Sequence, residues 1–146
     1  MSPLLIALVL FGILPPADLP DRVLSGFALE ILKQAGPLDE LEVAAFIVRA
    51  SDGTFSLRSW PNQRRFRSAQ WNGPIPAGVI AVIHSHPVMK PRPSEMDRAE
   101  AERLRIPFFV VSRNSLCKAD GRGDVRCAQS VPWLTRGGVA ALEWTD

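Results

Sequence analysis

The stretch that decides the fold is VIAVIHSHPVMKPRPSEMD, residues 79–97. It opens with five consecutive apolar residues, most of them β-branched, which is the pattern of a buried strand. It closes on Ser94, a residue type that often caps a helix, followed by Glu95 and Asp97, where the helix dipole favours acidic side chains. The stretch therefore predicts a buried strand at 79–83, a proline-rich connection and a helix at 94–105.

The two histidines of the chain, His84 and His86, follow this strand one residue apart. Alternate positions of a strand share a face, so both imidazoles can reach one ion. Asp97 adds a carboxylate from the helix that follows. Two His and one Asp leave a fourth tetrahedral position for water, which is the arrangement of a catalytic zinc site. We expect one Zn²⁺ per chain, with a water as the fourth ligand that becomes a nucleophile as its pKa falls.

The rest of the chain predicts one further helix and three further strands, at 21–35 and at 42–50, 55–60 and 106–111. Ser51-Asp52-Gly53-Thr54 is a hairpin turn between the first two of these strands. A second hairpin, with its tip near Asp120 to Gly123, ends a small meander. This order predicts an α+β fold, with a mixed sheet flanked by helices.

The two cysteines, Cys117 and Cys127, lie on either side of this second hairpin. If the hairpin is symmetric about Arg122, they occupy opposed strand positions, about 4.5–5.5 Å apart at Cα. That separation suits a disulfide in an oxidising compartment and two thiols in a reducing one.

The charge balance gives no case for a nucleic-acid partner. Lys and Arg number 17 against 15 acidic residues, a net charge of +2. Arg64, Arg65 and Arg67 cluster in one loop, but no wider basic field surrounds them, which favours a solvated loop.

The run HSHPVMKPRPSEMD, residues 84–97, resembles the signature of the JAMM (MPN+) metalloprotease family. The signature is His-x-His, seven residues, Ser, two residues and Asp, and every position matches. The resemblance implies an MPN/JAB-like, cytidine-deaminase-like three-layer domain over residues 21–146. It also implies that His84, His86 and Asp97 ligate zinc.

The family's catalytic glutamate stands upstream, at the start of a hydrophobic strand. Here Glu42 is in that setting, and it would pass a proton from the water to the leaving amine. Asp39 and Glu40 compete for the role, but Glu42 directly abuts the apolar run. Where the family usually has a glycine three positions later, this chain has Ala45.

Ser94 would, by the same resemblance, donate a hydrogen bond to the oxyanion of the tetrahedral intermediate. The alternative interpretation of Ser94 is that it serves as a helix N-cap. A hydroxyl can serve both, because its oxygen accepts while its proton donates.

The implied activity is that of an isopeptidase or peptidase acting on the C-terminal tail of a ubiquitin-like or sulfur-carrier protein. Asp97 is nine residues from Ile106, which leaves no room for a second insertion and favours a compact prokaryotic member. Three alternatives stay open. One is a RadC-like domain, another is a metal-free MPN interaction module, and the third is an exported peptidase acting on periplasmic peptides. The oligomeric state is not indicated.

Residues 1–20 form a hydrophobic N-terminal segment, either a signal or anchor or a part of the core. Its apolar run is too short for a comfortable membrane span of ~20 residues. It also lacks the basic start of a signal peptide. Membrane contact is expected only through residues 3–14. The location is left open between bacterial cytoplasm and, if the segment is a signal or anchor, membrane or periplasm.

Overall fold

The structure is a computed structural model that describes residues 19–36, 42–61, 71, 73–86, 90–130 and 142–145. Two helices and six strands occupy these residues. The helices are α2 (Asp21–Ala35) and α3 (Glu95–Leu104). The strands are β1 (Ala44–Arg49), β2 (Phe55–Ser59), β3 (Val79–Ser85), β4 (Phe108–Ser112), β5 (Ser115–Ala119) and β6 (Val125–Ser130). The predicted α+β fold class is confirmed.

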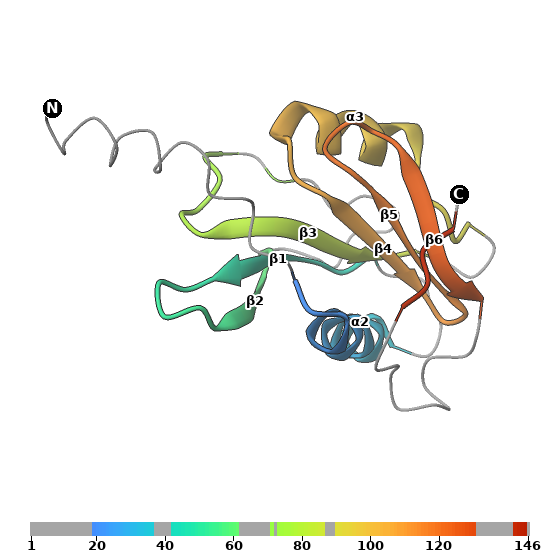
Figure 1. The fold of residues 1–146 in the computed structure, drawn as a ribbon, viewed down its shortest axis with the longest axis horizontal. Helices are drawn as coiled ribbons and strands as arrows, with labels where there is room; N and C mark the ends of the chain where they lie inside the picture. The colour runs from blue at the N-terminus through green and yellow to red at the C-terminus, as the bar shows by residue number, and fades with distance from the viewer. Residues whose placement is uncertain are drawn as a thin grey trace, which may run out of the picture.

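The six strands form one mixed sheet in the order β2-β1-β3-β4-β5-β6. Strands β3 and β4 are parallel, and α3 makes the crossover between them. The other neighbouring strands are antiparallel. This topology puts β3, with the histidines at its end, in the middle of the sheet and the start of α3 near that end (Figure 1).

The helices cover opposite faces of the sheet, so the domain has three layers (Figure 1). On one face, Ile31 of α2 packs in a core with Ile83. On the other, Ala101 of α3 packs in a core with Val82. Successive residues of β3 therefore enter different cores. Burial on both faces explains why its sequence is a continuous apolar run rather than an alternating one.

Several element boundaries differ from the sequence prediction by one or two residues. Strand β3 extends to Ser85, so His84 belongs to the strand itself. The predicted strand at 42–50 begins at Ala44, which leaves Glu42 two residues outside it. The predicted strand at 106–111 begins at Phe108. The residue before it is Pro107, whose nitrogen cannot donate to the sheet and whose carbonyl accepts the Val82 N–H at 3.0 Å.

The cysteine pairing expected from the hairpin is confirmed. Cys117 of β5 lies opposite Cys127 of β6, and the two form a disulfide. Their Cα atoms are 3.9 Å apart, closer than a regular strand pair. The turn that joins these strands is held by Asp120, whose carboxylate accepts the N–H groups of Arg122 and Asp124.

Several sequence predictions fall on residues that the structure does not describe. They concern residues 1–18, Asp39, Glu40, and the arginines at 64, 65 and 67. Within the described ranges, no helix is long and apolar enough to cross a membrane.

Candidate metal centre

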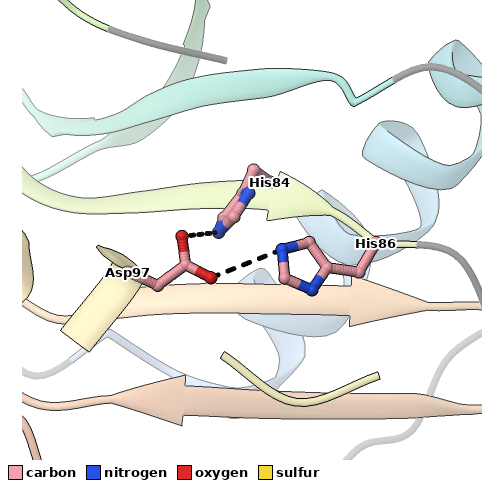
Figure 2. A group of neighbouring side chains, drawn as sticks. All are labelled: His84, His86 and Asp97. Atoms are coloured by element: carbon pink, nitrogen blue, oxygen red, sulfur yellow. Dashed lines mark ion pairs between the residues drawn. The ribbon is translucent and has the colours of Figure 1, made fainter. Parts of the chain in front are cut away.

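The candidate metal centre is formed by His84, His86 and Asp97, which come from two elements on one side of the sheet (Figure 2). His84 is the sixth residue of β3, and His86 directly follows the strand. Their rings lie on the same side, with centroids 4.7 Å apart and planes at 90°. Asp97 enters from the first turn of α3. The parallel crossover thus brings together the two halves of the sequence motif.

The carboxylate of Asp97 stands between the two imidazoles. Its Oδ1 is 3.2 Å from Nε2 of His84, and its Oδ2 is 3.3 Å from Nε2 of His86. One ligand atom from each of the three residues can be chosen so that all lie within 4.8 Å of one another. A single ion can therefore contact two nitrogens and one oxygen, a donor set suited to zinc.

Asp97 is held in this position by a capping box at the start of α3. Its N–H donates to Oγ of Ser94 at 3.1 Å, and its Oδ2 accepts the N–H of Ser94 at 2.8 Å. The predicted N-cap role of Ser94 is confirmed, and the residue also lies beside the candidate ligand Asp97. The hydroxyl oxygen accepts from the backbone, and its proton can still donate to a substrate.

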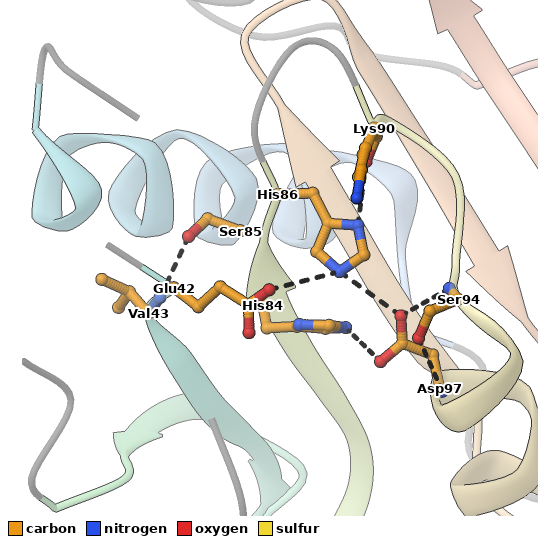
Figure 3. A network of polar contacts seen from close by, with 8 residues as sticks. All are labelled: Glu42, Val43, His84, Ser85, His86, Lys90, Ser94 and Asp97. Atoms are coloured by element: carbon orange, nitrogen blue, oxygen red, sulfur yellow. Dashed lines mark hydrogen bonds and ion pairs between the residues drawn. The ribbon is translucent and has the colours of Figure 1, made fainter. Parts of the chain in front are cut away.

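The ring of His86 is oriented by the connection that follows it. Nδ1 lies 2.9 Å from the backbone carbonyl of Lys90 (Figure 3). A carbonyl can only accept, so Nδ1 carries the proton, and in the neutral ring Nε2 presents its lone pair toward Asp97. This is the arrangement by which an outer carbonyl fixes the tautomer of a metal-binding histidine.

His84 supplies the observation that fits a metal best. Its side chain is only 8% exposed, and Nε2 makes no hydrogen bond with acceptable geometry among the described residues, despite the nearby Asp97 oxygen. A buried polar atom left in this way calls for a partner. An ion between His84, His86 and Asp97 would provide it.

The charges of the site shift two pKa values in the metal-free protein. Burial raises the pKa of Asp97, but the two neighbouring imidazoles and the backbone bond from Ser94 outweigh it, so the net shift is strongly downward. Burial lowers the pKa of His86, but Asp97 and Glu42 outweigh it, so the net shift is upward. The carboxylate is therefore ionised at neutral pH and ready to ligate a cation.

Glu42 precedes β1 and approaches the centre on the same face of the sheet, from the β1 side of β3. Its Oε1 lies 3.9 Å from Nε2 of His86, and its side chain is 18% exposed (Figure 3). The carboxylate is thus close to the candidate ligands without being inserted between them. The competing Asp39 and Glu40 lie outside the described residues.

Ala45, which replaces the family's usual glycine, does not enter the centre. It is fully buried in the core beneath α2, on the opposite face of the sheet. The departure from the family pattern therefore leaves the site residues untouched.

The sequence did not indicate the role of Lys90. It acts through its backbone carbonyl, and any residue type has a carbonyl. Only the path of the chain between His86 and Ser94 could reveal this contact.

Comparison with known protein families shows the family to which the chain belongs. The family model of prokaryotic homologues of the JAB domain matches residues 26–128, more than half of the sequence. The chain belongs to this family, which includes peptidases. The predicted resemblance to the JAMM/MPN-like family and the predicted MPN/JAB-like fold are confirmed. No curated protein matches the chain.

Proposed function

We propose that the chain is a zinc-dependent peptidase of the isopeptidase type, which hydrolyses an amide bond by activating water. The observation that carries this proposal is the convergence of His84, His86 and Asp97 on one point, with the Glu42 carboxylate beside it. A metal-free interaction module has no need for a buried imidazole nitrogen that lacks a well-formed hydrogen bond among the described residues, or for a carboxylate fixed against two histidines.

His84 Nε2, His86 Nε2 and a carboxylate oxygen of Asp97 would hold the ion. Zinc bound there would supply Lewis-acid chemistry, lowering the pKa of a water toward about 7 and polarising the substrate carbonyl. The protein holds the ligands in advance through the Lys90 carbonyl on His86 and the capping box on Asp97. Preorganised ligands need no rearrangement when the reaction occurs.

Glu42 is the general base in this proposal. Asp97 is committed to the ion, and among the described residues Glu42 is the carboxylate positioned to accept a proton beside the three ligands. Its Oε1 would take the proton of the attacking water and return it to the nitrogen of the leaving amine. Its partial exposure allows the substrate amine to approach it.

Ser94 would donate its hydroxyl proton to the oxygen of the scissile carbonyl as negative charge develops there. The bond that its oxygen accepts from the Asp97 N–H fixes the hydroxyl at the rim of the centre. Donors held in this way stabilise a transition state more than a ground state.

For the substrate, we propose the C-terminal tail of a ubiquitin-like or sulfur-carrier protein, or a conjugate joined through that tail. Family resemblance supports this class. An extended tail can be held by main-chain hydrogen bonds at an exposed strand, and β2 is an edge strand of the sheet. The second candidate substrate class is periplasmic peptides, which an exported peptidase would cleave.

The test is metal analysis of the full chain followed by hydrolysis of a ubiquitin-like protein carrying an amide-linked C-terminal extension. We expect about one zinc per chain, lost in His84→Ala, as a three-residue site requires. Glu42→Gln should keep the zinc and lose hydrolysis by roughly 10²- to 10⁴-fold, the usual contribution of a general base.

A matched control is Glu30→Gln, the same exchange at an exposed position of α2. It should keep both zinc and activity. A chain that stays metal-free in excess zinc would exclude the enzyme, and full activity in Glu42→Gln would assign the base to another residue.

A further inference from the structure

Ser85 lies between the two candidate zinc ligands in the sequence, but its side chain points to the opposite face of the sheet. Ile83, two residues earlier in β3, packs in the core beneath α2, and alternate strand positions share a face. Ser85 therefore points toward α2 and away from the centre (Figure 3). The residue is 3% exposed.

Ser85 holds Val43 through two hydrogen bonds. The last regular pair between β1 and β3 joins Ala44 to His84, and Val43 and Ser85 form the next pair in the same register. There the Ser85 N–H donates to the Val43 carbonyl at 2.9 Å, and the Val43 N–H donates to the Ser85 hydroxyl at 3.0 Å. The side chain thus extends the strand pairing one residue beyond its last regular backbone pair.

This extension ends next to Glu42. Val43 packs in the core beneath α2, so the preceding side chain points to the other face, where His84 and His86 lie. With both the N–H and the carbonyl of Val43 bonded to Ser85, the peptide that leads to Glu42 has a fixed direction. A backbone held in this way keeps the Glu42 carboxylate near its observed position, in which Oε1 is 3.9 Å from Nε2 of His86.

We infer that Ser85 is a positioning residue for the Glu42 carboxylate. This inference rests on the proposed function, in which Glu42 is the base. Ser85 touches neither the substrate nor the ion. Its hydroxyl acts through the backbone of Val43, and it ties the position of the base to the same strand end that carries both histidines.

A purely structural role for this hydroxyl makes different predictions. If Ser85 only provided an acceptor for a buried N–H, its loss would lower stability without a selective effect on the chemical step. If it positions Glu42, its loss lowers kcat at constant KM, because a misplacement of about 1 Å in a reacting group costs up to roughly 100-fold in rate.

The experiment compares Ser85→Ala with Ser85→Thr in the full zinc-loaded chain, on the amide-linked ubiquitin-like fusion. We expect Ser85→Ala to lower kcat roughly 10- to 100-fold with KM unchanged and with zinc still bound. Ser85→Thr keeps the hydroxyl on a residue that favours strands, and it should restore kcat. In the metal-free protein, amide exchange at Val43 should be faster in Ser85→Ala than in wild type, while Phe46 in β1 keeps its protection.

Ser115→Ala is the matched control, since it removes another buried hydroxyl, one that bonds the Ser112 hydroxyl at 2.7 Å at the end of β4 and start of β5. It should leave kcat unchanged. Should Ser85→Ala not fold, Ser85→Cys keeps the volume with a weaker acceptor and should show a smaller loss of kcat in the same direction.

An unchanged kcat in Ser85→Ala overturns the inference, and so does a loss that Ser85→Thr does not restore. Loss of zinc in Ser85→Ala would also overturn it, because the residue would then support β3 rather than Glu42. If the zinc-loaded wild-type chain hydrolyses no amide substrate, the proposed function fails. The Val43 exchange rate then shows separately whether the hydroxyl holds this segment.

Discussion

Ser94 and Asp97 hold each other through two reciprocal hydrogen bonds, of 3.1 and 2.8 Å, at the start of α3. The oxygen that accepts the Ser94 N–H is also the one that faces His86. The geometry of a helix start is thereby coupled to the geometry of the candidate metal centre. The coupling gives Ser94 two separable roles, one in the helix and one at the centre.

Variants of Ser94 should separate capping from chemistry. Ser94→Ala should lower the free energy of unfolding by about 1 kcal/mol, whereas Ser94→Gly should lower it by only a few tenths of a kcal/mol, since glycine is tolerated at N-caps. Both lack the hydroxyl, so both should lose roughly 10²- to 10³-fold in kcat. Urea unfolding and steady-state kinetics measure the two effects. If kcat follows stability across the two variants, Ser94 acts only as a cap.

Zinc affinity should weaken as the pH falls through the pKa of His86. That pKa is raised above the usual value of about 6.5, because the nearby Asp97 and Glu42 carboxylates favour the charged ring more than burial disfavours it. Zinc requires the neutral imidazole, so protons compete with the ion and are released when it binds. NMR titration of His86 in the metal-free protein and zinc titrations from pH 8 to about pH 5 would check this. Proton release that does not increase toward lower pH would contradict it.

The metal-free protein should lose stability in acid through Asp97. Its pKa is lower in the folded protein than the unfolded value of about 3.9, so its contribution is complete above that pH and is lost as the pH falls toward the folded value. The contribution of His86 to stability has the opposite pH dependence. Because its pKa is raised in the folded protein, this contribution is complete below about pH 6.5 and is lost as the pH rises through the folded value.

The variant Asp97→Asn tests this loss of stability in acid, because asparagine does not titrate. Unfolding by urea between about pH 2 and pH 6 should show a shallower pH dependence in this variant than in wild type. Equal slopes would show that other carboxylates cause the acid effect.

The disulfide should stabilise the fold without contributing to metal binding. Cys117 and Cys127 are 10 residues apart in sequence, and closing so short a loop in the unfolded chain is worth about 2–3 kcal/mol. The double variant Cys117→Ala, Cys127→Ala should therefore have a lower Tm but still bind about one zinc. A dithiol reductant should lower the Tm of wild type and leave that of the double variant unchanged. Loss of zinc on reduction would show that the disulfide supports the centre.

The residues of the centre were accessible from the sequence because local spacing decides them. Two histidines one residue apart at the end of an apolar run must share a face of a strand, and Asp97 three residues after a helix cap must lie in the first turn. The pairing of Cys117 with Cys127 followed in the same way, from the symmetry of a short hairpin.

Other features depended on contacts between distant parts of the chain. No local pattern could place the Glu42 carboxylate 3.9 Å from His86, because Glu42 lies outside any regular element and its direction follows from the β1–β3 register. The same holds for the Lys90 carbonyl on His86 and the Ser85 hydroxyl on Val43. The sequence by itself therefore determined which side chains can ligate a metal. The tertiary structure decided how they are held, because hydrogen bonds to backbone groups depend on where the chain passes and not on which residue passes there.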